Sequence, residues 1–152
     1  MNQAVLADTR DIVIDETFPH APATLWKTLT TPELMGRWLK MQPVGFEPVV
    51  GNRFTYQTTP AGEWDGVIHC EVLVAEPNAR LVYSWRGGHA SNNGGYGALL
   101  ETEVSFTLTA SDAGTRLHFV HSGFELPRNE TAYTNMSNGW HGVLERIDTL
   151  TA

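Results

Sequence analysis

The sequence ends in one long amphipathic pattern, which needs a single apolar surface to pack against. From about residue 129 the apolar residues recur at steps of three and four, the spacing of one helix face. They are Tyr133, Met136, Trp140, Val143, Leu144, Ile147 and Leu150. Most of the preceding chain alternates apolar and polar residues as strands do. The terminal helix is therefore expected to pack on the apolar face of a sheet.

The segments before this helix predict one strand, then two short helices and then about six further strands. Residues 11–18 alternate as a half-buried strand, and Pro22 and Pro32 then suit the first turns of two helices. Beyond them the period is two, with expected strands at 46–50, 53–59, 64–75, 80–86, 99–110 and from 114. Short turns such as Gly51-Asn52 imply antiparallel pairing. The predicted fold class is α+β, with an antiparallel sheet against the C-terminal helix.

Composition restricts the partners and the compartment. With 152 residues, 41% of them hydrophobic, the chain is expected to form one domain over residues 1–152, its core spanning about 11–150. The formal net charge of -7, without a cluster of Lys or Arg, argues against nucleic acid and anionic membranes as partners. Cys70 is the one cysteine, so no intrachain disulfide forms. With no signal peptide or apolar run of ~20 residues, a cytoplasmic location without a membrane span is expected.

Two titratable residues are candidates for chemistry on the apolar face of the sheet. His118 and His121 lie three apart on one strand, so their side chains point to opposite faces and do not share a metal ion. His121 falls on the apolar face, as a structural histidine or a proton donor. Glu16 interrupts the apolar face of the first strand, as a paired carboxylate, as a residue at the end of the sheet, or as a general acid or base. His121 and Glu16 are the catalytic candidates, and neither a metal site nor a cofactor is expected.

Aromatic residues predicted to face inward are the candidate binding residues. Bulky rings there fit an ordinary core and the lining of an apolar ligand pocket equally well. The candidate set is Tyr56, Tyr83, Trp85, Phe106, Phe119, His121, Tyr133, Met136 and Trp140. Residues 87–97 form a glycine-rich segment between two strands, typical of a flexible hairpin loop or of a flap over such a site.

Several short motifs, in their order along the chain, resemble one superfamily. The motifs lie at residues 22–26, 31–34 with Trp38, 51–54, 77–85, 114–124 and 139–144. Together they are similar to the SRPBCC superfamily, the START/Bet v 1-like helix-grip proteins, over about residues 11–150. Within it they most resemble the AHSA1-like branch, named for the activator of Hsp90 ATPase. The resemblance implies a six- or seven-stranded antiparallel sheet wrapped around the C-terminal helix, two short helices closing one end, and a hydrophobic cavity.

The resemblance does not imply one activity, because the superfamily includes lipid carriers, aromatases and cyclases, receptors and co-chaperones. The leading expectation is a binding protein that holds an apolar or amphipathic small molecule between sheet and helix. One alternative is an interaction module with an Hsp90-type chaperone as partner. Another is a polyketide cyclase-like or aromatase-like enzyme that uses the same cavity. A homodimer contact, if one forms, is expected to involve an exposed Trp64 or residues 87–97.

Overall fold

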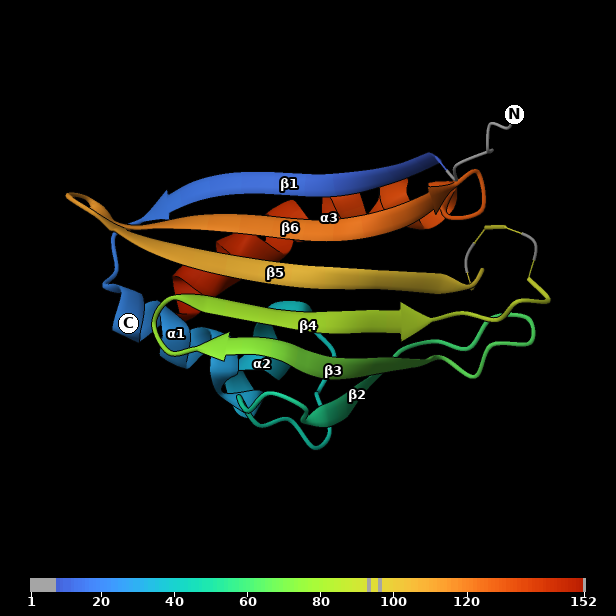
Figure 1. Cartoon of the computed structure of the whole chain (residues 1–152), viewed down its shortest axis with the longest axis horizontal. Helices are drawn as coiled ribbons and strands as arrows, with labels where there is room; N and C mark the ends of the chain where they lie inside the picture. The colour runs from blue at the N-terminus through green and yellow to red at the C-terminus, as the bar shows by residue number, and fades with distance from the viewer. Residues whose placement is uncertain (1–7, 93, 96, 152) are drawn as a thin grey trace, which may run out of the picture.

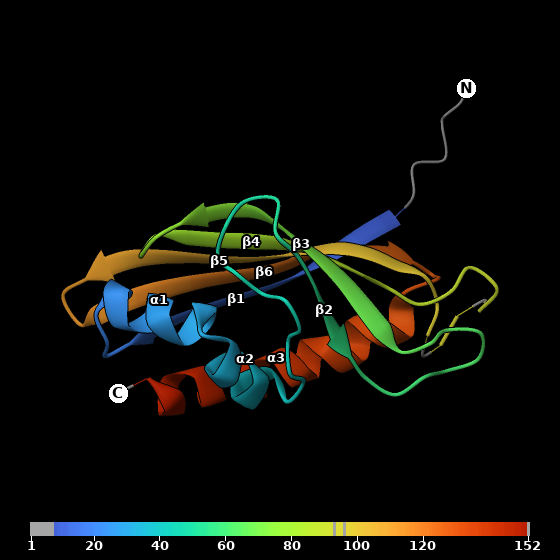
Figure 2. The same cartoon turned by 90° about the horizontal axis from the view of Figure 1, so that it is seen from below.

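A single six-stranded sheet and three helices make up the computed structural model, which describes residues 8–92, 94–95 and 97–151. The elements are β1 (Asp8–Phe18), α1 (Pro22–Thr30), α2 (Pro32–Leu39), β2 (Arg53–Gln57), β3 (Val67–Glu76), β4 (Arg80–Gly87), β5 (Leu100–Ser111), β6 (Gly114–Leu126) and α3 (Glu130–Leu150). Neighbouring strands are antiparallel in the order β1-β6-β5-β4-β3-β2. Figure 1 looks onto the sheet with the helices behind it, and Figure 2 shows the sheet curving over α3. The predicted helix-grip arrangement is confirmed.

Local sequence explains where the helices begin. Pro22 and Pro32 stand in the first turns of α1 and α2, where a missing backbone N–H costs nothing. The start of α3 is held by Asn129, which is 1% exposed. Its Nδ2 donates to the Leu99 carbonyl at 2.7 Å, and its Oδ1 accepts from the Glu125 N–H at 3.0 Å. These bonds attach the residue before α3 to the end of β6 and to the residue that precedes β5.

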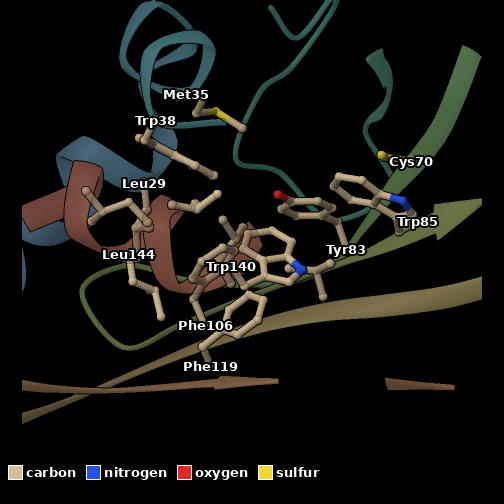
Figure 3. Close-up of a cluster of buried hydrophobic side chains, with 14 of the residues drawn as sticks. Leu29, Met35, Trp38, Cys70, Tyr83, Trp85, Phe106, Phe119, Trp140 and Leu144 are labelled. Atoms are coloured by element: carbon tan, nitrogen blue, oxygen red, sulfur yellow. The ribbon is translucent and has the colours of Figure 1, made fainter. Parts of the chain in front are cut away.

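The inner face of α3 completes the core, as its spacing predicts. Trp140, Val143, Leu144 and Ile147 are buried against the concave face of the sheet. Trp140 lies among the aromatic side chains of β4, β5 and β6 (Figure 3), with its ring centroid 4.3 Å from that of Phe119. Full burial of side chains of this size contributes roughly 1.5–3 kcal/mol each. No helix in the described ranges is both long and apolar enough to cross a membrane.

A bulge in β6 changes which residues face the core. Phe119 and His121 point inward in strict alternation, but the next buried residue is Phe124, three positions on. Gly123 between them has a φ of 97°, a conformation that costs glycine little, and its N–H donates to the side chain of Asp11. The added residue brings the His121 and Phe124 rings to a centroid distance of 4.5 Å.

The expected strand at residues 46–50 does not form, so the sheet has six strands. Pro48 removes one backbone donor, and the side chain of Asn52 closes a loop instead of a two-residue hairpin. Its Nδ2 donates to the Gly45 carbonyl at 2.9 Å, and its Oδ1 accepts from the Glu47 N–H at 2.9 Å. This loop runs beside β2, which pairs with β3.

The strand expected from residue 64 begins at Val67 instead. Gly66 has a φ of 83°, and the Asp65 side chain accepts a bond from the Val67 N–H, so a turn precedes the strand. Trp64 folds inward over Gly87 and is only 9% exposed. The expectation that Trp64 is exposed is therefore wrong.

Candidate ligand pocket

A pocket of about 330 Å³ opens where the β2–β3 and β4–β5 connections meet α3. Figures 1 and 2 place both connections at the same end of the sheet. Most of the pocket's large side chains are apolar. They are Leu39, Met41, Trp64, Ile68, Trp85, Leu100, Met136, Trp140 and Val143. Concave, mostly apolar pockets of roughly 300–1,000 Å³ are typical of small-molecule sites, and this volume lies at the small end of that range.

Glycines shape the mouth of the pocket. Gly87, Gly88 and Gly97 line one wall and Gly139 of α3 another, so backbone faces the opening at these positions. Gly88 has a φ of 79°, and a Cβ there would lie 2.0 Å from the Ala98 carbonyl oxygen, which excludes other residues. Part of the glycine-rich segment therefore borders the pocket, and its residues 93 and 96 lie outside the described ranges.

The side chain of Asn92 joins the two connections at the mouth. Its Nδ2 donates to the carbonyls of Ala61 at 3.0 Å and Gly97 at 2.9 Å. The described part of the glycine-rich segment is thus bonded to the β2–β3 connection and holds one wall of the pocket in place.

The nine candidate binding residues divide into two groups. Trp85, Met136 and Trp140 line the pocket. The other six do not line it: Tyr56, Tyr83, Phe106, Phe119 and His121, which are 0% exposed, and Tyr133, which packs on Phe124. Among the described residues, rings in mutual contact pack the interior between sheet and helix, and the pocket opens at one end of this core.

The two interior tyrosines show how tightly this core is closed. The hydroxyl oxygens of Tyr56 and Tyr83 lie 3.4 Å apart, and the Phe54 ring packs edge-on against both. Burial raises the pKa of both phenols well above their usual value. The neighbouring Cys70 is also buried, which raises the pKa of its thiol. All three groups stay neutral, as structural core residues do.

His121 faces inward, as predicted, and both of its ring nitrogens are bonded. Trp140 Nε1–H donates to Nδ1 at 3.0 Å, which assigns the hydrogen of the neutral ring to Nε2. Nε2 lies 2.8 Å from Thr102 Oγ1, and that hydroxyl donates to the Trp85 carbonyl at 2.8 Å. Burial lowers the pKa of His121 to about 3. The structure therefore supports a neutral structural histidine that links α3 to β4, β5 and β6.

Glu16, the second catalytic candidate, is exposed. It lies near the end of β1, an edge strand, and its register partner is Leu117, whereas His121 is paired with Ile12. Four residues of strand separate the two positions, about 13 Å at 3.3 Å per residue. Glu16 interrupts the series Ile12, Ile14 and Phe18, as predicted, but it does so at the end of the sheet, where its carboxylate is exposed. At this separation His121 and Glu16 do not form an acid–base pair.

His118 lies on the outer face of the sheet, opposite to His121, as the alternation predicts. Its Nδ1 is 2.9 Å from a carboxylate oxygen of Asp15, and Arg116 donates to the same oxygen at 3.0 Å. The hydrogen bond from His118 is the main cause that holds the pKa of Asp15 below its usual value. Within the described ranges, no group of three His, Cys, Asp or Glu residues is arranged to hold a metal ion.

The pocket contains one ionisable side chain among its described lining residues, Arg146, which the sequence reasoning missed. Arg146 follows Gly139, Gly142 and Val143 at helical steps of three and four, so these residues share one side of α3. Two glycines on an otherwise helical pattern were the available signal, because they leave space beside the helix.

A curved antiparallel sheet that holds a long C-terminal helix defines the helix-grip class, the Bet v 1-like fold of the SRPBCC proteins. The chain belongs to the family described as "Activator of Hsp90 ATPase homolog 1-like protein", whose model matches residues 19–152. Both the fold and the family agree with the resemblance that the sequence motifs indicate.

Solved structures support this assignment. Protein MLL2253 from Mesorhizobium loti is 37% identical, with 93% of this chain and 96% of that chain aligned at a TM-score of 0.79. Protein BH1534 from Bacillus halodurans is 20% identical, covering 97% and 100% of the two chains, with a TM-score of 0.73. CalU16 from Micromonospora echinospora is 22% identical, covering 95% and 77%, with a TM-score of 0.71. The last two share the fold. No curated protein matches the sequence.

Proposed function

We propose that the protein binds a small apolar or amphipathic molecule in the pocket between α3 and the two connections at its mouth. The observation that carries this proposal is an open, mostly apolar pocket of about 330 Å³ at one end of a core of packed side chains. Its small volume favours a compact ligand over one of sterol size.

The pocket favours binding over acid–base catalysis. General acid–base chemistry needs a titratable group within hydrogen-bond reach of the substrate. Among the described residues that line the pocket, only Arg146 is ionisable, and a guanidinium donates hydrogen bonds but accepts none. We therefore do not propose a cyclase or aromatase reaction.

A chaperone contact is the second candidate, supported by the family's description and by one surface feature. Val44, Val49 and Val50, beside the edge strand β2, are 65%, 58% and 63% exposed. Such side chains suit an apolar protein contact. This candidate requires that the purified protein stimulate the ATPase of an Hsp90 homologue from the same host, and no stimulation at saturating protein would remove it.

Position 139 provides a direct test of pocket binding. Gly139 lines the pocket within α3, and a Cβ built there meets no atom within 4 Å. We expect Gly139→Trp to fill the pocket and to weaken binding of the neutral fluorescent probe phenylnaphthylamine by at least about tenfold, since most of the apolar surface offered to the probe is lost. Fluorescence titration measures the affinity.

Gly139→Ala is the matched control. A methyl group leaves the pocket open, and alanine in a helix interior is more favourable than glycine by roughly 0.5–1 kcal/mol. We expect higher stability in urea unfolding with probe affinity close to that of the wild type. Equal probe affinity in the wild type and Gly139→Trp would contradict binding in this pocket.

A further inference from the structure

We infer that the ligand of the pocket carries a single negative charge, as a compact carboxylic or sulfonic acid does, and that Arg146 binds its acidic group. The inference rests on the proposed function, since it concerns the same pocket. It specifies which class of molecule the pocket selects.

The guanidinium of Arg146 is held in place by one bond. Its Nε donates to the Trp38 carbonyl at 2.9 Å. That carbonyl belongs to the last turn of α2, where helix carbonyls have no partner within the helix. The bond joins α2 to α3 and fixes the orientation of the guanidinium beside the pocket.

The guanidinium of Arg146 lies beside Gly142 on α3. A Cβ at Gly142 would lie 3.4 Å from Nη1 of Arg146, so the side chain extends back along α3. Gly139 and Val143, which line the pocket, lie on the same side of the helix. The guanidinium therefore contributes to the wall of the pocket.

The Nη groups of Arg146 are available to a ligand. In the described part of the chain, no carboxylate lies within 4.0 Å of this guanidinium. No hydrogen-bond acceptor is found for either Nη atom among the same residues. Neither Nη atom is among the buried side-chain atoms that lack a partner, so both remain accessible. Paired Nη donors match the two oxygens of a carboxylate, which arginine binds with two parallel hydrogen bonds.

The charge distribution restricts the ligand further. None of the described pocket-lining residues is acidic, so the charge of Arg146 is not neutralised inside the pocket. The whole chain has a formal net charge of -7, which repels a highly charged anion on approach. One acidic group on a compact apolar body satisfies both conditions, whereas a nucleotide or a polyphosphate does not.

Two fluorescent probes with the same ring system test this inference. Anilinonaphthalene sulfonate carries one negative charge, and phenylnaphthylamine is its neutral counterpart without the sulfonate. We expect the wild type to prefer the sulfonate by about tenfold, and the preference to decrease with added salt. In Arg146→Gln, whose amide N–H can still donate to Trp38, the preference is expected to disappear. In Arg146→Lys, which retains the charge, it is expected to remain in part.

The outcomes separate this inference from the proposed function. If the wild type binds both probes equally, or if Arg146→Gln keeps the preference, the acidic-ligand inference is overturned while pocket binding stands. If Arg146→Gln weakens both probes in parallel, Arg146 acts through the structure of the pocket and the inference also fails. If neither probe binds the wild type, the proposed function itself fails.

Discussion

Trp140→Ala is expected to destabilise the protein by about 3–5 kcal/mol, the usual cost of removing a buried tryptophan from a packed core. Trp140 is 3% exposed, and its ring contacts those of Trp85, Phe106 and Phe119. The substitution also removes the donor to His121 Nδ1. Urea unfolding followed by circular dichroism gives the difference in unfolding free energy.

Trp140→Phe separates the hydrogen bond from the packing. Phenylalanine keeps most of the ring contacts but leaves Nδ1 of His121 buried without a donor, which costs about 1–3 kcal/mol. The loss is therefore expected to be clear but smaller than that of Trp140→Ala. If Trp140→Phe were as stable as the wild type, the bond between Trp140 and His121 would not stabilise the fold.

Replacing His121 is expected to change how stability depends on pH. The pKa of His121 is lowered to about 3 in the folded protein, against 6.5 for an unperturbed histidine. Between these values the unfolded chain binds a proton that the folded protein does not. The contribution of the neutral His121 ring to the unfolding free energy is therefore complete above pH 6.5. It is lost as the pH falls toward 3, at a rate approaching about 1.4 kcal/mol per pH unit.

His121→Gln provides the comparison, since its amide can donate to Thr102 and accept from Trp140 without titrating. We expect urea unfolding at a series of pH values to show a shallower loss of stability in the variant below pH 6.5. The Asp15–His118 pair on the outer face is common to both proteins, so its contribution cancels in the difference. Parallel pH profiles would show that the buried ring is not responsible.

Alternation along the strands was sufficient to predict which side chains enter the core. It placed His121 inside and His118 outside, and it assigned Tyr83 and Trp85 to the inner face, where their rings contact those of Phe106 and Trp140. Period-two patterning works there because one face of the sheet is covered by α3 and the other is not.

The sequence pattern was not sufficient where a side-chain hydrogen bond or the end of a strand decides the local structure. The Asn52 side chain replaces a hairpin with a loop, and Glu16 reaches solvent from the end of an edge strand. The extent of the pocket depends on how the rings of the core fill space, which spacing does not encode. Arg146 was missed because its position beside the pocket follows from the bond to Trp38, a contact between distant segments.

Native mass spectrometry of the protein purified from its own host tests the central claim most directly, because it detects a bound small molecule without assuming its identity. We expect a one-to-one adduct in the wild type and in Gly139→Ala that is absent from Gly139→Trp, and we expect the released molecule to be acidic. An adduct retained equally by Gly139→Trp would contradict binding in this pocket. So would a wild type that carries no adduct and binds neither fluorescent probe.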